Sequence, residues 1–433
     1  MKIFIETLGC PKNFNDSEVA AGILEKSSHE IVKTPSEADA IMVNTCGFIG
    51  DAKKESIERI FDMVSYKKIL IVSGCLAERY NDELFEELPE ADIMIGVNDY
   101  ENLPQILDSY DRGKRRKQFS LYDKEKINPA RKFSDNPYSA TIKIAEGCNN
   151  RCTYCIIPFI RGNYRSVPKE QIIEEAERLA NAGTKELILI AQDTTAYGMD
   201  FDGKYHLAEL LRELCKVDGI KWIRILYAYE DRITDELIDV MAEEEKICKY
   251  IDIPIQHVSD NVLNMMERRS SKRSIKSTLE KLRKNVPGIH IRTTLIVGFP
   301  GESGEDFDEL MNFVAEEKFD RLGVFAYSPE EGTKAAEMTS QLDEKTKAFR
   351  LDQVMSMQME TSLNLNKGKI GQEFDVIIDE EDEKGVYIGR TQYDAPEIDN
   401  TVLVRTRQKH NPGDFVRVKI TDAFDYDLVG EEI

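Results

Sequence analysis

In the first 105 residues, apolar runs typical of strands alternate with stretches that have helical periodicity. Short apolar runs at 2–8, 40–44 and 69–72 predict strands, and a stretch with helical periodicity follows each of them, at 16–26, 51–64 and 81–88. Asn15 and Glu18 have the spacing of a capping box, which predicts the start of the first helix. Strands that alternate with helices predict a parallel sheet with both faces covered.

The same alternation resumes near residue 139. Six strands are predicted at 141–145, 186–191, 222–227, 250–255, 290–297 and 322–327. Helical patterns at 169–181, 207–216, 235–245, 274–284 and 303–316 separate them. Six consecutive strand–helix units predict an open, partial (βα)6 barrel of the TIM type, whose chemistry lies at the carboxyl ends of the strands.

A helical stretch at 345–366 connects this barrel to a different pattern. Five short strands are predicted at 373–378, 385–390, 401–405, 414–420 and 427–429, with Gly and Pro between them. This pattern indicates a small OB-like β-barrel. The expected fold class is therefore α/β with a C-terminal β-barrel.

A chain of 433 residues is too long for one ordinary core. We expect an N-terminal domain at 1–110, a linker at 111–137, a core domain at 138–366 and the β-barrel domain at 367–433. The basic run at 112–117 suits a solvated linker better than an RNA contact. With no apolar run of about 18 residues and no signal-peptide pattern, we expect a cytoplasmic protein without a membrane partner.

Cys148, Cys152 and Cys155 form the most specific chemical motif. They directly follow the predicted strand at 141–145, with Cys-x3-Cys-x2-Cys spacing. Three thiolates can hold three irons of a [4Fe-4S] cluster and leave the fourth iron open to a small molecule. A structural zinc site is the alternative, but it takes four ligands, and no fourth Cys or His lies close in the sequence.

Cys10, Cys46 and Cys75 are far apart in sequence but equivalent in position. Each lies just beyond the carboxyl end of a different predicted strand and beside a glycine. Because such strand ends converge on the binding crevice of an open α/β sheet, we infer a second three-cysteine cluster. Three buried structural cysteines are the alternative. Cys215 and Cys248 lack partners at a suitable spacing and are interpreted as inert.

The run from Cys148 to Cys155 resembles the signature of the radical S-adenosylmethionine (SAM) enzymes. This resemblance implies that SAM binds the open iron and is cleaved to a 5′-deoxyadenosyl radical. It also implies that Tyr154 contacts the adenine, and that Asp193, Gly298 and Glu302, in the loops after the second and fifth strands, surround SAM. Packing in the core is the alternative for Tyr154, and capping of a following helix is the alternative for each carboxylate.

His257 follows the fourth strand of the predicted barrel. It could position the substrate or move a proton, or it could be a structural histidine with satisfied hydrogen bonds. No catalytic residue is assigned from the sequence.

The two cysteine triads, the partial barrel and the OB-like tail together resemble the radical SAM methylthiotransferases, whose tail is called a TRAM domain. The resemblance implies two [4Fe-4S] clusters and SAM as cofactors. Cys148, Cys152 and Cys155 would hold the cluster that binds SAM. Cys10, Cys46 and Cys75 would hold an auxiliary cluster that delivers sulfur.

Two substrate classes exist in this family: an adenosine beside the tRNA anticodon, and an aspartate of ribosomal protein uS12. The stretches 8–13 (LGCPKN), 44–49 (NTCGFI) and 256–259 (QHVS), together with Tyr164, resemble the second branch, whereas Val167 departs from it. The net charge of −22, and the nine basic against 16 acidic residues in 366–433, favour a basic protein over a nucleic acid. Acidity that only maintains solubility is the alternative.

The expected reaction therefore places a methylthio group on the β-carbon of a uS12 aspartate, with uS12 either free or in the small ribosomal subunit. An electron donor and a sulfur source are required as further partners. No nucleic-acid contact is expected except with ribosomal RNA beside the substrate. A two-cluster electron carrier without catalysis is the alternative from another class, but it has no use for SAM-binding loops.

Overall fold

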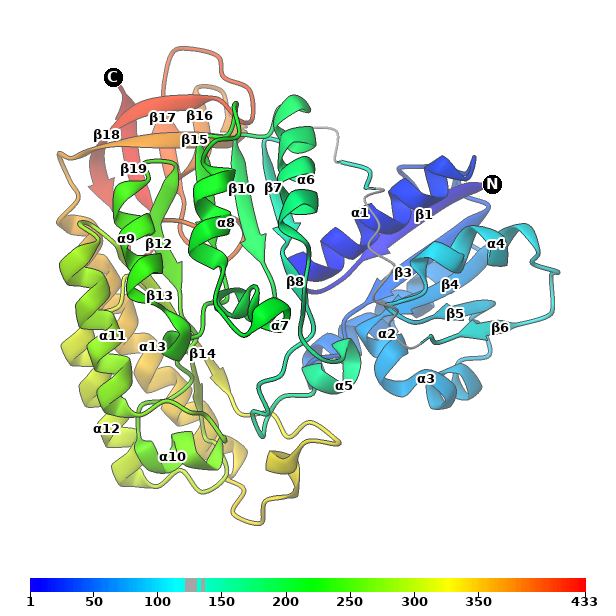
Figure 1. Cartoon of the computed structure of the whole chain (residues 1–433), viewed down its shortest axis with the longest axis horizontal. Coiled ribbons are helices and arrows are strands. Elements are labelled where there is room, and N and C mark those ends of the chain that lie inside the picture. The colour runs from blue at the N-terminus through cyan, green and yellow to red at the C-terminus, as the bar shows by residue number, and fades with distance from the viewer. Residues whose placement is uncertain (121–130, 134–136) are drawn as a thin grey trace.

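The N-terminal domain is built on a parallel sheet (Figure 1). The computed structural model of the chain describes residues 1–120, 131–133 and 137–433. In these residues the sheet has the strand order β2-β1-β3-β4-β5-β6. Its strands are β1 (Lys2–Thr7), β2 (Glu30–Ile31), β3 (Ala40–Thr45), β4 (Ile69–Gly74), β5 (Ile93–Ile95) and β6 (Arg116–Gln118).

Helices cover both faces of this sheet, as the alternating pattern predicts. Apolar residues of α1 (Pro11–Lys26), the 3-10 helix η1 (Tyr100–Asn102) and α4 (Leu103–Asp108) pack on one face. Those of α2 (Gly50–Val64) and α3 (Cys75–Glu87) pack on the other. The sheet is therefore packed between two hydrophobic core layers, and the loops lie at the carboxyl ends of its strands.

Three predictions for this domain are wrong in detail. The first helix begins at Pro11, whose fixed φ suits the first helical position, so Asn15 and Glu18 do not form its cap. The third helix begins at Cys75 and is kinked at Asn81. Strand β6 pairs with β5 inside the segment expected to be a linker, so the end of the basic run belongs to the sheet. The rest of that segment lies partly outside the described residues.

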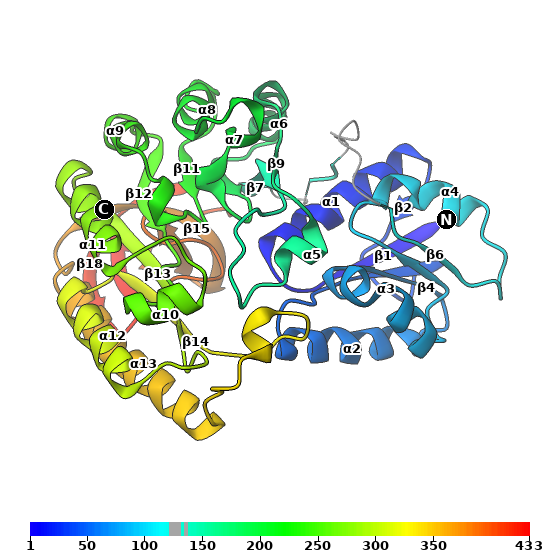
Figure 2. The ribbon, with the colours of Figure 1, turned by 60° about the horizontal axis from the view of Figure 1, so that its bottom comes forward.

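The predicted partial barrel is confirmed. The described part of the chain has a parallel sheet with strands in chain order, open between the first and the last (Figure 2). The strands are β7 (Ser139–Lys143), β10 (Glu186–Ile190), β11 (Trp222–Ile225), β12 (Ile247–Asp252), β13 (His290–Val297) and β14 (Arg321–Ala326). The helices outside are α6 (Lys169–Asn181), α8 (Leu207–Leu214), α9 (Asp235–Glu243), α11 (Lys272–Asn285) and α12 (Gly304–Glu317).

Short elements occupy the carboxyl ends of these strands. Strand β8 (Ala145–Glu146) pairs with β9 (Arg165–Ser166) and brackets the loop that carries the local cysteine motif. The other short elements are α5 (Ile157–Arg161), η2 (Thr194–Ala196), α7 (Met199–Asp202), η3 (Glu230–Arg232), α10 (Asp260–Met265) and η4 (Lys334–Glu337). No helix in the described residues is long and apolar enough to cross a membrane.

The C-terminal domain is a closed five-stranded barrel, as predicted. It follows α13 (Glu344–Lys367), and its strand order is β15-β16-β17-β19-β18. The strands are β15 (Glu373–Glu383), β16 (Val386–Thr391), β17 (Val402–Arg405), β18 (Phe415–Ala423) and β19 (Leu428–Glu432). The acidic run 379–383 thus extends β15, where Asp379 is paired with Arg390 and the four residues after it are exposed.

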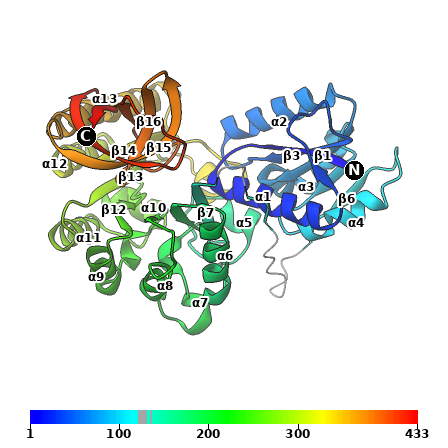
Figure 3. The same cartoon turned by 90° about the horizontal axis from the view of Figure 1, so that it is seen from above.

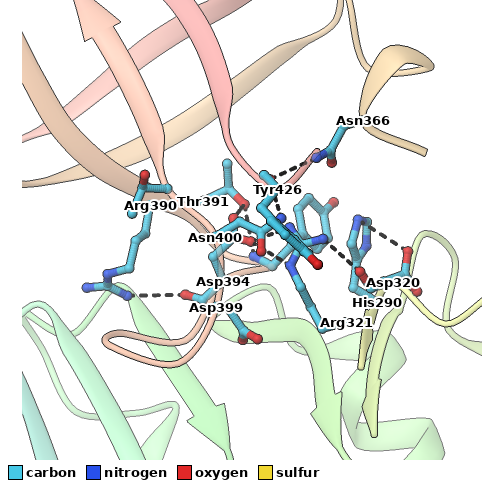
Figure 4. Close-up of polar contacts among 12 residues, drawn as sticks. His290, Asp320, Arg321, Asn366, Arg390, Thr391, Asp394, Asp399, Asn400 and Tyr426 are labelled. Atoms are coloured by element: carbon cyan, nitrogen blue, oxygen red, sulfur yellow. Dashed lines mark hydrogen bonds and ion pairs between the residues drawn. The ribbon is translucent and has the colours of Figure 1, made fainter. Parts of the chain in front are cut away.

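This small barrel sits on the amino ends of the core strands. Asp394 pairs at 2.5 Å with Arg321, the first residue of β14, and Arg390 pairs at 3.0 Å with Glu186, the first residue of β10. The Tyr250 hydroxyl donates to Asp399 at 2.6 Å. Figure 4 shows this contact region, with Asp394 and Asp399 beside Arg321. The C-terminal barrel therefore closes the end of the core barrel opposite to the cysteine loops.

The N-terminal domain lies beside the core barrel (Figure 3) and contacts it at both open edges. At one edge, Lys143 of β7 pairs with Asp16 of α1 at 2.5 Å. At the other, Glu330, which follows β14, is buried and pairs with Lys53 at 2.8 Å and with Arg79 at 3.0 Å. The domain thus bridges the first and last strands and presents its own cysteine loops to the mouth of the barrel.

Candidate active site

The dispersed cysteines meet at the carboxyl edge of the N-terminal sheet. They follow the neighbouring strands β1, β3 and β4, and the pairing of Thr45 with Gly74 puts Cys46 and Cys75 at equivalent positions. Burial, opposed by Arg161 and supported by the nearby Cys10 and Cys46, raises the pKa of the Cys75 thiol to about 11. The structure therefore brings together the three side chains that the sequence singles out.

Gly74 makes this convergence possible. Its φ is +91°, and a Cβ there would lie 2.4 Å from the carbonyl oxygen of Thr45. A residue with a side chain would therefore be strained and would also collide with the adjacent strand. The missing side chain lets β3 and β4 approach each other immediately before their cysteines.

The local triad lies on the loop between β8 and α5. Gly147, with φ +76°, starts this loop, and a Cβ there would lie 2.2 Å from the backbone oxygen of Asn163. Cys148 is buried. The pKa of the Cys155 thiol is raised to about 12, mainly by burial and also by the nearby Cys152 and Cys148. All eight cysteines of the chain carry free thiols.

Arg161 connects the two triads, and no local sequence pattern singles it out. It ends α5, six residues after Cys155, and is buried. Its guanidinium donates to the Cys75 sulfur at 3.2 Å and to the Asn13 side-chain oxygen at 2.9 Å, and pairs with Asp16 at 2.6 Å. The helix that follows the local triad thus reaches the dispersed triad in the other domain.

A buried ionic group surrounds this connection. Besides Asp16, Lys143 pairs with Glu146 at 2.8 Å, and Gln192 donates to Glu146 at 2.6 Å. Burial opposes the ionisation of Glu146, but Lys143 and then Arg161 hold its pKa well below the usual range. Glu146 is the residue before Gly147, so this group fixes the start of the local cysteine loop.

Lys12 lies on the dispersed-triad side and points across to the barrel. It follows Cys10 by two residues, and its Nζ lies 3.4 Å from the centre of the Tyr227 ring, which follows β11. Burial lowers the pKa of Lys12, against the influence of Cys10. The same ammonium lowers the pKa of Cys155. Lys12 is therefore electrostatically close to a cysteine of each triad.

Tyr154 belongs to a small aromatic cluster at the mouth. Its ring meets that of Phe299 edge to face, with centroids 6.5 Å apart, and its hydroxyl lies 3.3 Å from Arg268, which donates to it. Arg268 is buried, pairs with Glu230 at 2.9 Å and lies over the Tyr229 ring. The packing role considered from the sequence is thus present, and the ring still adjoins the cysteine loop.

Asp193 and Glu302 both have partners within the protein. Asp193 caps η2 by accepting from the Ala196 amide at 3.1 Å, and it also pairs with Arg232. Glu302 is buried and accepts from the Phe299 amide at 2.9 Å. It does not cap the following helix α12, which begins with a capping box formed by Ser303 and Asp306. Both carboxylates hold the loops on which they lie.

Gly298 and His257 occupy the adjacent strand ends. Gly298 has φ +72°, and a Cβ there would lie 2.4 Å from the Lys347 side chain, so the backbone turns closely against α13. His257 is buried, and its Nδ1 accepts from the Ser259 amide at 3.0 Å. Its Nε2 faces Glu302 at 3.9 Å. This Nε2 is buried and has no hydrogen-bond partner among the described residues, so the alternative of a structural histidine with satisfied hydrogen bonds is met at Nδ1 only.

Three family models match separate parts of the chain. The Radical SAM superfamily matches residues 142–314, the TRAM domain matches residues 370–433, and an uncharacterized protein family, UPF0004, matches residues 2–96. These matches coincide with the core barrel, the C-terminal barrel and the N-terminal sheet.

Solved structures with a similar fold have low sequence identity to the chain. The radical S-adenosylmethionine methyltransferase TsrM from Kitasatospora setae has a TM-score of 0.57 at 13% identity, covering 77% of this chain and 73% of that one. The cobalamin-dependent S-adenosylmethionine radical enzyme OxsB has a TM-score of 0.52 at 14% identity, covering 82% of this chain and 56% of that one. These similarities support the fold.

Two relatives named ribosomal protein uS12 methylthiotransferase RimO match almost end to end. The protein from Desulforamulus reducens is 49% identical over 435 residues, covering 98% of each chain. The one from Clostridioides difficile is 48% identical over 439 residues, covering 100% of this chain and 98% of that one. At this identity and coverage, the chain belongs to the ribosomal protein uS12 methylthiotransferase family of radical SAM enzymes.

Proposed function

We propose that the chain uses two [4Fe-4S] clusters and SAM to add a methylthio group to the β-carbon of an aspartate of ribosomal protein uS12. One observation carries this proposal: two groups of three thiols lie on opposite sides of one domain interface and are joined through Arg161. The relatives carry the name of this activity, and the chain matches them over its whole length.

The cysteines suit such clusters. Cys10, Cys46 and Cys75 would hold one, and Cys148, Cys152 and Cys155 the other, each triad leaving one iron without a protein ligand. In the described residues, no three His, Cys, Asp or Glu side chains are grouped to hold a single metal ion. A cubane distributes its thiolates over different irons, so its ligands surround a volume rather than a point. Coordination would also keep the buried thiols deprotonated.

When bound, SAM and its cluster supply a radical that removes hydrogen from an unactivated carbon, and the auxiliary cluster supplies sulfur. The residues of the chain position these groups. We assign the Tyr154 ring and the Gly298 backbone to SAM contacts, and Asp193 and Glu302 to holding the SAM loops in shape. Arg161 fixes the distance between the two triads.

The substrate class follows from charge as well as from family. The chain carries a net charge of −22, and the exposed part of the acidic run in β15 repels phosphates. Because the TRAM barrel lies at the opposite end of the core strands, this charge acts by attracting a basic protein rather than by touching the reacting residue. A tRNA substrate would meet an unfavourable field instead.

We further propose that the enzyme acts in the cytoplasm, where ribosomes assemble, and takes electrons and sulfur from separate donors. Its functional divisions are the auxiliary-cluster domain at 1–110, a connection at 111–137, the radical SAM domain at 138–366 and TRAM at 367–433. The pairing of β6 with β5 indicates that the first division extends past residue 110.

An anaerobic assay tests the proposal. The reconstituted chain is incubated with SAM, a reductant and either uS12 or unmodified tRNA. Mass spectrometry then detects any methylthio group on the uS12 or on the tRNA. We expect one methylthio group on one uS12 aspartate and unchanged tRNA. Modified tRNA with untouched uS12 would contradict the substrate assignment. Absence of 5′-deoxyadenosine would instead support an electron carrier without catalysis.

A further inference from the structure

The Lys12 ammonium lies on an aromatic ring and forms no ion pair with the described residues. Its Nζ lies over the Tyr227 ring at 3.4 Å. Among the residues that the structure describes, no carboxylate oxygen lies within the 4.0 Å that defines an ion pair with this nitrogen. A cation held on an aromatic face retains its capacity for strong hydrogen bonds to an anion.

Five other cations around the triads are paired with carboxylates. Arg161 and Lys143 share Asp16, and the remaining pairs are Arg292–Asp252 at 2.9 Å, Arg268–Glu230 at 2.9 Å and Arg232–Asp193. Unpaired charge away from water is costly, so a protein normally provides the partner. Lys12 differs from these five cations, and since it is only partly buried, a ligand can supply the missing charge.

The support beneath Lys12 is fixed by hydrogen bonds. Tyr227 has a φ of +60°, which is uncommon for a bulky residue. Its amide donates to Asp252 at 3.1 Å, and Asp252 is itself held by Arg292. The nearby Asp252 is therefore committed to other partners, and the Tyr227 backbone is held in place where its ring meets Lys12. Strained, fixed backbone of this kind is typical of functional sites.

We propose that Lys12 binds the side-chain carboxylate of the substrate aspartate, with Tyr227 aiming the ammonium, an inference that rests on the function proposed above. Lys12 lies two residues from Cys10 in the N-terminal domain, and the Tyr227 ring beneath it follows β11 of the barrel that carries the local triad. A carboxylate held there lies at the interface between the two domains that carry the triads. The same pair offsets the repulsion between an acidic substrate and two anionic clusters. Lys12 thus selects an acidic side chain over a neutral one of the same shape.

A binding experiment tests this assignment. A labelled uS12 peptide that contains the target aspartate, and the same peptide with asparagine there, are titrated into the reconstituted full chain under anaerobic conditions. We expect the chain to prefer the aspartate peptide by about 10- to 100-fold, the range for a hydrogen bond to a charged group. Lys12→Met should reduce this preference to near unity by weakening only the aspartate peptide. Lys12→Arg should keep most of it.

Lys26→Met is the matched control, because Lys26 lies on the same helix but is exposed. It should keep the full preference. An unchanged preference in Lys12→Met would overturn the inference. So would loss of iron from that variant, or loss of SAM cleavage without peptide, since these results would assign Lys12 to a cluster or to SAM. If the unaltered chain leaves uS12 unmodified, the proposed function itself fails, and this inference fails with it.

Discussion

The two cysteine triads are built in opposite ways. Cys148, Cys152 and Cys155 lie within one loop. Its shape is set by backbone hydrogen bonds within the loop and by the pairing of β8 with β9. Cys10, Cys46 and Cys75 come from three strands, and their position depends on sheet register and on Arg161 from the other domain. The local triad is thus a property of a segment, whereas the dispersed one is a property of the assembled fold. The two should respond differently to the same kind of damage.

Removing one cysteine from each triad should give the largest and clearest difference. Cys148→Ala should abolish 5′-deoxyadenosine formation, because SAM then lacks its cluster. Cys75→Ala should keep SAM cleavage but yield no methylthio product, because the sulfur donor is lost. Chromatography of both products from one reaction separates the two outcomes.

Cys215→Ala serves as the control for both cysteine variants, since this residue lies outside both triads. It should leave both products unchanged. Equal loss of SAM cleavage in Cys75→Ala and Cys148→Ala would show that the triads do not have separate tasks.

Arg161→Met should affect the dispersed triad selectively. Removing one partner of a buried pair costs about 3–5 kcal/mol, and Arg161 also contacts the Cys75 sulfur. We expect less iron at the auxiliary site, an intact SAM cluster and a lower urea midpoint. Electron paramagnetic resonance and urea titration measure these changes.

Arg212→Met is the matched control, because Arg212 forms an exposed ion pair at 3.7 Å with Glu236. Such a pair contributes at most about 1 kcal/mol. Loss of both clusters to the same extent in Arg161→Met would contradict a selective role for this arginine.

Substitution of one glycine beside each triad should have a moderate effect. Gly147→Ala and Gly74→Ala each place a Cβ against backbone oxygen, at 2.2 and 2.4 Å. Overpacking of this kind costs about 1–3 kcal/mol, and each variant should lose iron mainly from its own triad. Gly183→Ala separates collision from backbone strain, since its φ is +109° but nothing lies within 4 Å. Iron loss in Gly183→Ala as well would refute the steric explanation.

Tyr154→Phe should give the smallest effect. It removes only the hydroxyl that accepts from Arg268 at 3.3 Å, and a hydrogen bond contributes about 0.5–1.5 kcal/mol. We expect SAM to bind at most about tenfold more weakly, whereas Tyr154→Ala, which removes the ring, should weaken it more. Equilibrium dialysis with SAM measures both. Equal affinities for the two variants would argue against an adenine contact.

The sequence alone predicts much of this arrangement. The local motif is visible from spacing, and the dispersed triad follows from placing each cysteine at a strand end. What the pattern misses depends on contacts between distant segments. The helical pattern places Asp16 at the start of a helix, but its side chain pairs with Arg161, which lies 145 residues further along the chain. The position of Lys12 over Tyr227 likewise requires the docking of two domains, which no local pattern encodes.

The docking of the TRAM barrel also cannot be predicted from local sequence patterns. Its strands and closure follow from alternation, but its place at the amino ends of the core strands depends on buried pairs such as Arg321–Asp394. The acidic character of this domain is evident from its composition. That its charge lies away from the cysteine loops could be learned only from the structure.

Iron analysis tests the central claim most directly. The anaerobically purified chain should hold about eight iron atoms, as two [4Fe-4S] clusters. A variant with Cys10, Cys46 and Cys75 all changed to Ala should hold about four, and so should a variant with Cys148, Cys152 and Cys155 changed. About four irons in the unaltered chain, or no loss of iron without the dispersed triad, would contradict two separate, incompletely ligated clusters.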